Sequence, residues 1–346
     1  MNEYESYENF TEEQEKNDNL PPFTNNFPGY QMPKQEKERL KVRKAANIIG
    51  FSLVILTLFS TFWASGYYLI MSKIGIDMKK AQEIITEPGT LQFVQILFSI
   101  IVFTLPFILL VKINGERVSD LVPFKRCNKN QILPYYFIGI GFCAFANIAT
   151  NIAGAIFESF GVSYDVDFGD TPPGAFGFML TLISTAIVPA LVEEFACRGI
   201  MLNLLKKQGD AFAIIVSALL FGLVHGNFEQ IPFAFMVGLV LGFITVKTGS
   251  IFIAIAVHFT NNLISVIFSY VNLSLMARNV VYIIYLSVCM LLAVISVCSI
   301  REKNFFSLQK SESEVSARVR AKWFFTSPVI IIFIALSLLE AILHFF

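Results

Sequence analysis

The sequence predicts an all-α protein, a polytopic bundle of about eight or nine membrane-spanning helices. The 346 residues are 55% hydrophobic and only 15% charged, with a mean hydropathy of +0.63, whereas soluble domains carry about 25% charged residues. Runs of about twenty apolar residues recur along the chain, which is the length that crosses a bilayer as a helix. The lipid bilayer is therefore the first predicted partner.

The first 44 residues precede the apolar segments and divide by charge. The opening stretch is acidic, is rich in Asn and Pro, and lacks helical or strand periodicity, so we expect it to be disordered. The following KQEKERLKVRKAAN is basic, which is typical of the cytoplasmic flank of a membrane helix. We therefore predict a disordered cytoplasmic tail with a basic flank over 1–44, followed by a transmembrane domain over 45–346.

Nine apolar segments follow in order along the chain. One of them, at 174–205, is too long for a perpendicular span, so we expect a tilted helix there. Pro189 lies inside this segment and lacks the N–H that would bond back to residue 185, which predicts a kink. The nine segments are 45–71, 91–111, 131–157, 174–205, 211–226, 230–246, 250–270, 280–299 and 325–346.

Charges in the connections predict the orientation, because Lys and Arg accumulate on the cytoplasmic side. The flank before the first span, the connection at 112–129 and the connection at 301–322 are rich in these residues. In contrast, ESFGVSYDVDFGDTPP has none and carries several acids. This pattern predicts a cytoplasmic N-terminus, and the polar tail favours a bacterial plasma membrane.

Net charge and cysteine spacing exclude several functions. The formal net charge is zero, so no basic field is available to attract nucleic acid. The five cysteines have no CxxC spacing and predict neither a disulfide framework nor a zinc cluster. Cys197 lies in an apolar setting, and we expect its thiol to be inert.

The stretch ALVEEFACRGIML places three charged residues inside an apolar segment. A charge at mid-membrane costs about 3 kcal/mol on insertion scales, so these residues must pair or line a wet cavity. Glu194 and Arg198 are four residues apart on one helical face, which predicts an ion pair. Glu193 is rotated away from Arg198, and it is therefore a candidate general base.

Two of the three histidines also lie in apolar segments. FGLVHG contains His225, and AVHFTNN places His258 and Asn262 four residues apart on one helical face. With a rise of about 1.5 Å per residue, Glu193, His225 and His258 lie about 18, 21 and 12 Å from the cytoplasmic ends of their segments. Three polar clusters at similar depth predict one site that is built from three helices.

These residues resemble the motifs of a known family. EEFACRG is similar to EExxxR, FGLVH to FxxxH, and HFTNN to HxxxN, the motifs of the CAAX protease and bacteriocin-processing (CPBP, or Abi) family. This family includes the type II CAAX prenyl endopeptidases. The resemblance covers a predicted catalytic core at 174–272. Many members have an aromatic residue before the motif arginine, where this chain has Cys197, which bears on the shape of the pocket.

The resemblance implies an intramembrane endopeptidase, and it implies roles for the site residues. Glu193 and His225 would activate a water molecule, while His258 and Asn262 would stabilise the oxyanion. Alternatively, Glu193, His225 and His258 could bind Zn²⁺, as in other metallohydrolases. The sequence leaves a zinc metalloprotease and a metal-free glutamate protease as equal alternatives. The motif pair Glu194 and Arg198 completes the candidate catalytic set.

The expected substrate is a membrane-associated peptide or protein. Two other functions stay open. The first is a catalytically silent scaffold that binds a partner protein, against which the presence of all the motif residues argues. The second is a proton-coupled transporter that uses Glu193 as its carrier, although the sequence shows no inverted repeat.

Overall fold

The computed structural model describes residues 32–87, 89–159, 171–300 and 305–345. Within these ranges the regular elements are helices, and a single antiparallel bridge joins Phe124 to Ser250. The predicted all-α class is therefore confirmed. The α-helices are α2 (Lys34–Lys73), α3 (Met78–Thr86), α4 (Thr90–Ile113), α5 (Val118–Leu121), α6 (Lys129–Ser159), α7 (Gly174–Thr181), α8 (Val188–Glu194), α9 (Leu202–Lys206), α10 (Asp210–Val224), α11 (Gln230–Thr248), α12 (Phe252–Tyr270), α13 (Leu275–Ser299), α14 (Ala317–Phe325) and α15 (Pro328–Phe345).

The described helices include seven that are long and apolar enough to cross a membrane. An eighth span is possible if α14 and α15, which are bent by 70° at their junction, are taken together. Each of the nine predicted segments is helical, but the fifth corresponds to α10, which has only 15 residues. The protein is thus an integral membrane protein with a polytopic helical bundle.

Helix α2 begins at Lys34 rather than near residue 45. The basic flank consists mainly of Lys, Glu and Arg, which are good helix formers. Within it, Glu36 pairs with Arg39 at 3.4 Å and Glu38 pairs with Lys41 at 2.9 Å, both at i,i+3 spacing. The helix therefore extends through the flank. The predicted disordered stretch, residues 1–31, lies outside the described residues.

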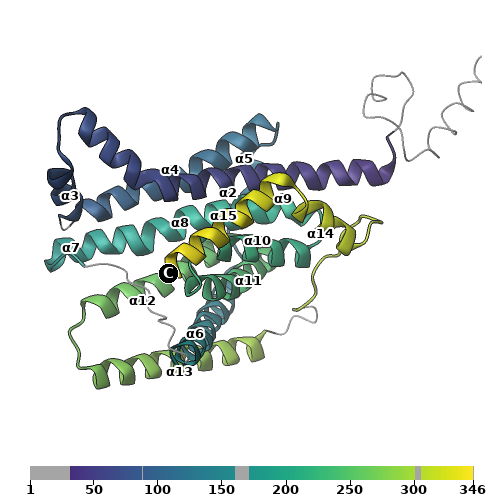
Figure 1. Ribbon diagram of the computed structural model, residues 1–346. Coiled ribbons are helices and arrows are strands. Elements are labelled where there is room, and N and C mark those ends of the chain that lie inside the picture. Colours follow the sequence, from purple (N-terminus) through teal and green to yellow (C-terminus); the bar gives the residue numbers. More distant parts are fainter. Residues whose placement is uncertain (1–31, 88, 160–170, 301–304, 346) are drawn as a thin grey trace, which may run out of the picture.

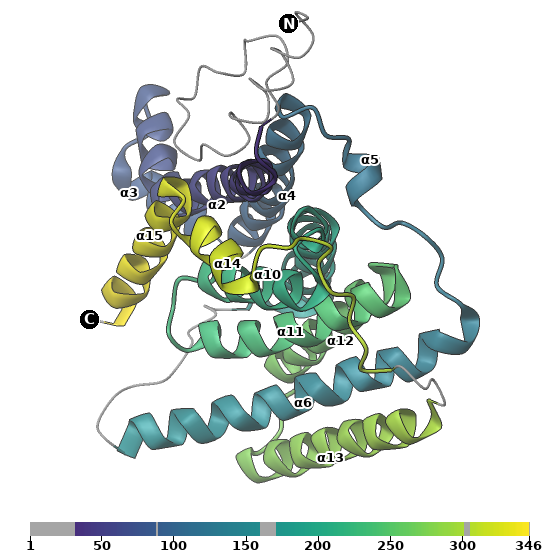
Figure 2. The same ribbon diagram turned by 90° about the vertical axis from the view of Figure 1, so that its right-hand side faces the viewer.

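The helix that carries the Glu193–Glu194 pair runs through the middle of the bundle (Figure 1). It is continuous from Gly174 to Lys206, as expected for the long fourth segment. Helix α4 packs on one side of it and α12 on another, and α10 follows it after a short turn. Helices α6 and α13 lie side by side at one edge of the bundle (Figure 2). The central helix therefore contacts the helices that carry the other motifs.

Helices α10 and α11 approach each other closely through glycines. A Cβ atom at Gly238 would lie 2.9 Å from the Cα atom of Ala218, and one at Gly222 would lie 2.9 Å from the carbonyl oxygen of Ile231. Small residues at such positions allow membrane helices to pack by van der Waals contact. This packing fixes α10, at whose end His225 lies.

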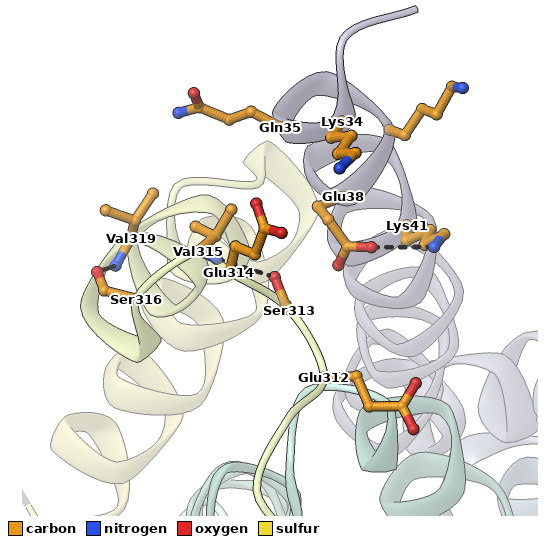
Figure 3. Close-up of a pocket in the computed structure, with 11 residues that line it drawn as sticks. Lys34, Gln35, Glu38, Lys41, Glu312, Ser313, Glu314, Val315, Ser316 and Val319 are labelled. Atoms are coloured by element: carbon orange, nitrogen blue, oxygen red, sulfur yellow. Dashed lines mark hydrogen bonds and ion pairs between the residues drawn. The ribbon is translucent and has the colours of Figure 1, made fainter.

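The segment that precedes α14 is bonded to the turn between α9 and α10. The backbone N–H of Gln309 donates to Asp210 Oδ2 at 2.8 Å, and the Asp210 N–H donates to the Gln309 carbonyl at 3.0 Å. Between this segment and the start of α2 lies a cavity of about 630 Å³, lined by charged side chains of both signs (Figure 3). Glu193, His225 and His258 are not among its lining residues, so this cavity is separate from the candidate site.

Candidate active site

The central helix departs from α-helical geometry on both sides of the acidic pair. Residues Leu182–Ile187 and Phe195–Met201 are π-helical, and α8 lies between them. Pro189 is at the start of α8 and has no N–H to donate to the carbonyl of Thr185. The sequence predicted a kink at Pro189, whereas the helix continues from Gly174 to Lys206 with π-helical turns on both sides of α8. Such turns re-aim side chains and occur often at functional sites.

Glu194 and Arg198 form the predicted ion pair. Arg198 Nη1 donates to Glu194 Oε1 at 2.7 Å, and the two side chains are 1% and 0% exposed. The Arg198 guanidinium also lies 4.4 Å from the ring centroid of Phe221, which is a cation–π distance. Two separate contacts thus hold the buried guanidinium.

His258 lies between the two carboxylates. Its Nδ1 atom is 2.9 Å from Glu194 Oε1, which is a hydrogen bond, and its Nε2 atom is 3.9 Å from Glu193 Oε2. The Glu193 side chain is 16% exposed, whereas that of Glu194 is completely buried. The sequence predicted the pairing of Glu194 with Arg198, but it did not predict the hydrogen bond between Glu194 and His258.

His225 follows the last residue of α10 and serves as its C-cap. The Nδ1 atom lies 2.9 Å from the carbonyl oxygen of Phe221, which can only accept, so Nδ1 carries a proton and donates it. This contact leaves Nε2 available to other groups. The Phe221 ring lies 5.0 Å from the ring of His225 and 6.3 Å from that of His258, centroid to centroid. The Phe221 ring is therefore a neighbour of both imidazoles.

Asn262 lies one turn after His258 on α12. Its Nδ2 atom donates to the carbonyl oxygen of Thr185 at 3.0 Å. Within the described part of the chain, His225 makes no hydrogen bond to Glu193 or to Asn262. Direct contacts thus connect four of the predicted residues: Glu193, Glu194, Arg198 and His258. The other two are linked to this group indirectly, His225 by the ring of Phe221 and Asn262 by the carbonyl of Thr185.

Two further residues lie beside the site, outside the predicted catalytic set. Asn261 donates from Nδ2 to Asn262 Oδ1 at 3.2 Å. Glu340, on α15, lies so close to Gly226 that a Cβ atom there would be 2.8 Å from the Glu340 Cδ atom. A carboxylate in an apolar helix was a visible signal for Glu340, whereas nothing in the sequence distinguishes Asn261 from a residue that faces away.

A metal ion needs several ligands gathered around one point. In residues 32–87, 89–159, 171–300 and 305–345, no group of three or more His, Cys, Asp or Glu side chains is placed to hold one. As positioned, Glu193, His225 and His258 therefore do not fit a zinc site with three protein ligands. The chemistry below is accordingly derived from the side chains of the chain alone.

Carboxylates, imidazoles and an amide thus lie near one another among the membrane helices. Residues 175–264 match the family model of type II CAAX prenyl endopeptidase Rce1-like proteins. This stretch of the chain, about a quarter of its length, is therefore similar to the domain of those proteins. No curated protein and no solved structure matches the chain.

The matched region extends over the three motifs. It begins near the start of α7 and ends within α12, two residues after Asn262. Helices α2, α4, α6, α13 and α15 lie outside it. The site is thus built within the family domain, while helices outside the domain pack around it.

Proposed function

We propose that the protein is an intramembrane endopeptidase that uses Glu193 as its general base. The observation that carries this proposal is the position of His258 between Glu194 and Glu193, within the Rce1-like domain. A general base works together with a donor that stabilises the negative charge formed in the transition state. Here Glu193 would be the base and His258 the donor, and their side chains lie 3.9 Å apart.

The reaction is hydrolysis of a peptide bond. A water molecule held by Glu193 and His225 gives a proton to the Glu193 carboxylate, and its oxygen attacks the peptide carbonyl carbon. The carbonyl oxygen becomes an oxyanion that accepts hydrogen bonds from His258 Nε2 and Asn262 Nδ2. The C–N bond then breaks, and Glu193 returns the proton to the leaving amine nitrogen. No step requires an oxidant or a second reactant.

The charges of the cluster support this assignment. Two carboxylates and one guanidinium leave a net charge of −1 in a buried setting, which is costly. For His258 to donate from Nε2 to the oxyanion while Nδ1 donates to Glu194, the ring must carry a proton on each nitrogen. Glu194 and Arg198 therefore serve to position His258, and do not touch the substrate.

We expect the substrate to be a peptide or protein held at the membrane, because the site lies among membrane helices. The family model describes prenyl endopeptidases, so a prenylated C-terminus is the first substrate to test. We further propose a cytoplasmic N-terminus, which the basic flank and connections favour, in a bacterial plasma membrane.

The test is cleavage in reconstituted liposomes. The wild type, Glu193→Ala and a control variant, Glu116→Ala, are incubated with a library of prenylated and plain peptides. Glu116 is a carboxylate that is paired with Lys44, outside the cluster. We expect cleavage by the wild type and the control, and none by Glu193→Ala. Equal products from the wild type and Glu193→Ala would refute the proposal, as would the absence of products from both.

A metal arm completes this test. The same assay is repeated after thorough chelation and again after zinc is restored. Undiminished cleavage after chelation supports the glutamate mechanism. Loss by chelation with recovery by zinc would instead favour the metalloprotease alternative. Proton flux without cleavage, lost in Glu193→Ala, would indicate a transporter, and a partner protein bound equally by both forms would indicate a scaffold.

A further inference from the structure

We propose that Asn261 and Asn147 are positioning residues that fix the orientation of the Asn262 amide. This inference rests on the proposed function, because it concerns how the oxyanion donor is held. Asn147 is on α6, outside the Rce1-like region, and Asn261 occupies one of the x positions of the HxxxN pattern in HFTNN. Neither residue belongs to the three family motifs.

A directed series of hydrogen bonds carries the proposal. Asn147 Nδ2 donates to the carbonyl oxygen of Cys143 at 2.9 Å and to Asn261 Oδ1 at 3.4 Å. Asn261 Nδ2 then donates to Asn262 Oδ1 at 3.2 Å. Asn262 Nδ2 donates in turn to the carbonyl oxygen of Thr185 at 3.0 Å. Backbone carbonyls, which only accept, are at both ends of the series.

The two ends determine which way each amide faces. If the Asn262 side chain were flipped, its oxygen would face the Thr185 carbonyl oxygen, and its nitrogen would face the nitrogen of Asn261. Both contacts would then be repulsive. The same holds for Asn261, whose oxygen accepts from α6 and whose nitrogen is directed toward Asn262. The orientation is thus imposed by neighbours on two other helices.

The orientation of the Asn262 amide determines whether an N–H bond or an oxygen faces the oxyanion. The Asn262 nitrogen has two N–H bonds, and one donates to Thr185. The other is without a protein acceptor among the described residues, so it can meet the oxyanion. A flipped amide would present an oxygen, which repels an oxyanion. Asn261 and Asn147 therefore act on the reaction only through Asn262.

The Thr185 carbonyl is available because of the sequence around it. Pro189, four residues later, has no N–H to donate to it. A proline that interrupts the ladder of the central helix therefore provides an acceptor for the amide on α12. The helix that carries Glu193 therefore also helps to orient the Asn262 amide, through the Thr185 carbonyl.

A double-mutant cycle tests the proposal. Asn261→Ala is measured in the wild type and in an Asn262→Ala background, with steady-state cleavage kinetics in liposomes. We expect Asn261→Ala to lower kcat by about 10- to 100-fold with little change in KM, because a donor that is misplaced loses much of its effect. In the Asn262→Ala background the same change should have no further effect. Asn147→Ala should act in the same direction but less strongly.

Thr260→Val is the matched control. Thr260 Oγ1 is hydrogen-bonded to Tyr136 of α6 at 2.9 Å, so this variant also removes a bond between α6 and α12, without touching Asn262. We expect its kcat to stay within about twofold of the wild type. Size-exclusion profiles of all variants verify that they are folded. Asn261→Asp adds a shape-conserving test, because it replaces the donor by an acceptor, and it should be at least as impaired as Asn261→Ala.

Several results would overturn the proposal. An equal loss of kcat from Asn261→Ala in both backgrounds would show that Asn261 does not act through Asn262. A raised KM with unchanged kcat would indicate contact with the substrate. A drop in Thr260→Val as large as in Asn261→Ala would indicate general packing. If Glu193→Ala abolishes cleavage but Asn262→Ala does not reduce kcat, the positioning role fails while the general base stands. If the wild type is no better than Glu193→Ala, both proposals fail.

Discussion

Removal of the Arg198 guanidinium should destabilise the protein far more than removal of a comparable charge at the surface. Glu194 is completely buried, and its Oε1 atom accepts from both Arg198 and His258. The variant Arg198→Met keeps the length of the side chain but leaves a buried carboxylate without its main partner. Breaking a buried ion pair in this way costs about 3–5 kcal/mol.

The pair of Lys44 and Glu116 provides the comparison. Its atoms are 2.8 Å apart, nearly the same distance as in the buried pair, but the side chains are 44% and 35% exposed. Water screens such a pair, so Lys44→Met should cost about 0.2–1 kcal/mol. The distances are alike, so the expected difference of about 2–5 kcal/mol comes mainly from burial.

The assay is reversible unfolding in mixed micelles, with the free energy measured for the wild type, both Met variants and the double variant Glu194→Gln/Arg198→Met. The double variant removes the charge together with its partner, so it should recover part of the loss in Arg198→Met. Equal free energies for Arg198→Met and Lys44→Met would refute the reasoning. So would a double variant that is less stable than Arg198→Met.

Three further predictions follow from the structure. Gly238→Val should lower the free energy of unfolding by about 1–3 kcal/mol, because even a Cβ atom would lie 2.9 Å from the Cα atom of Ala218, and the same unfolding assay measures it. The hydrogen bond from Lys44 lowers the pKa of Glu116, so the stability difference between wild type and Glu116→Gln should be present near neutral pH and disappear as the pH falls below about 4; a difference that grows in acid would contradict this. Asn262→Ala should lower kcat by about 100- to 1,000-fold with KM nearly unchanged, as expected for loss of an oxyanion donor, and a change in KM alone would contradict this role.

The positions of the long apolar helices could be predicted from the sequence, because hydropathy and length determine which segments cross a bilayer. The ion pair of Glu194 and Arg198 could also be predicted, because i,i+4 spacing on a helix is independent of the rest of the fold. The start of α2 was misplaced, because a charged flank of good helix formers continues the helix beyond the apolar run.

Contacts between helices needed the tertiary structure. Similar depth predicted that Glu193, His225 and His258 could converge, but depth alone does not determine which face of a helix meets which neighbour. The packing of α12 against the central helix decided that His258 lies between the two carboxylates. It also decided that the ring of Phe221 lies beside both His225 and His258.

The sequence by itself determined the fold class, the buried ion pair and the residue types of the candidate site, because these depend on hydropathy and on spacing within one helix. The tertiary structure alone decided the partners of each side chain across helices, including the series from Asn147 through Asn261 to Asn262. The physical reason is that a hydrogen bond between helices depends on rotation and register, which follow from the packing of the whole bundle.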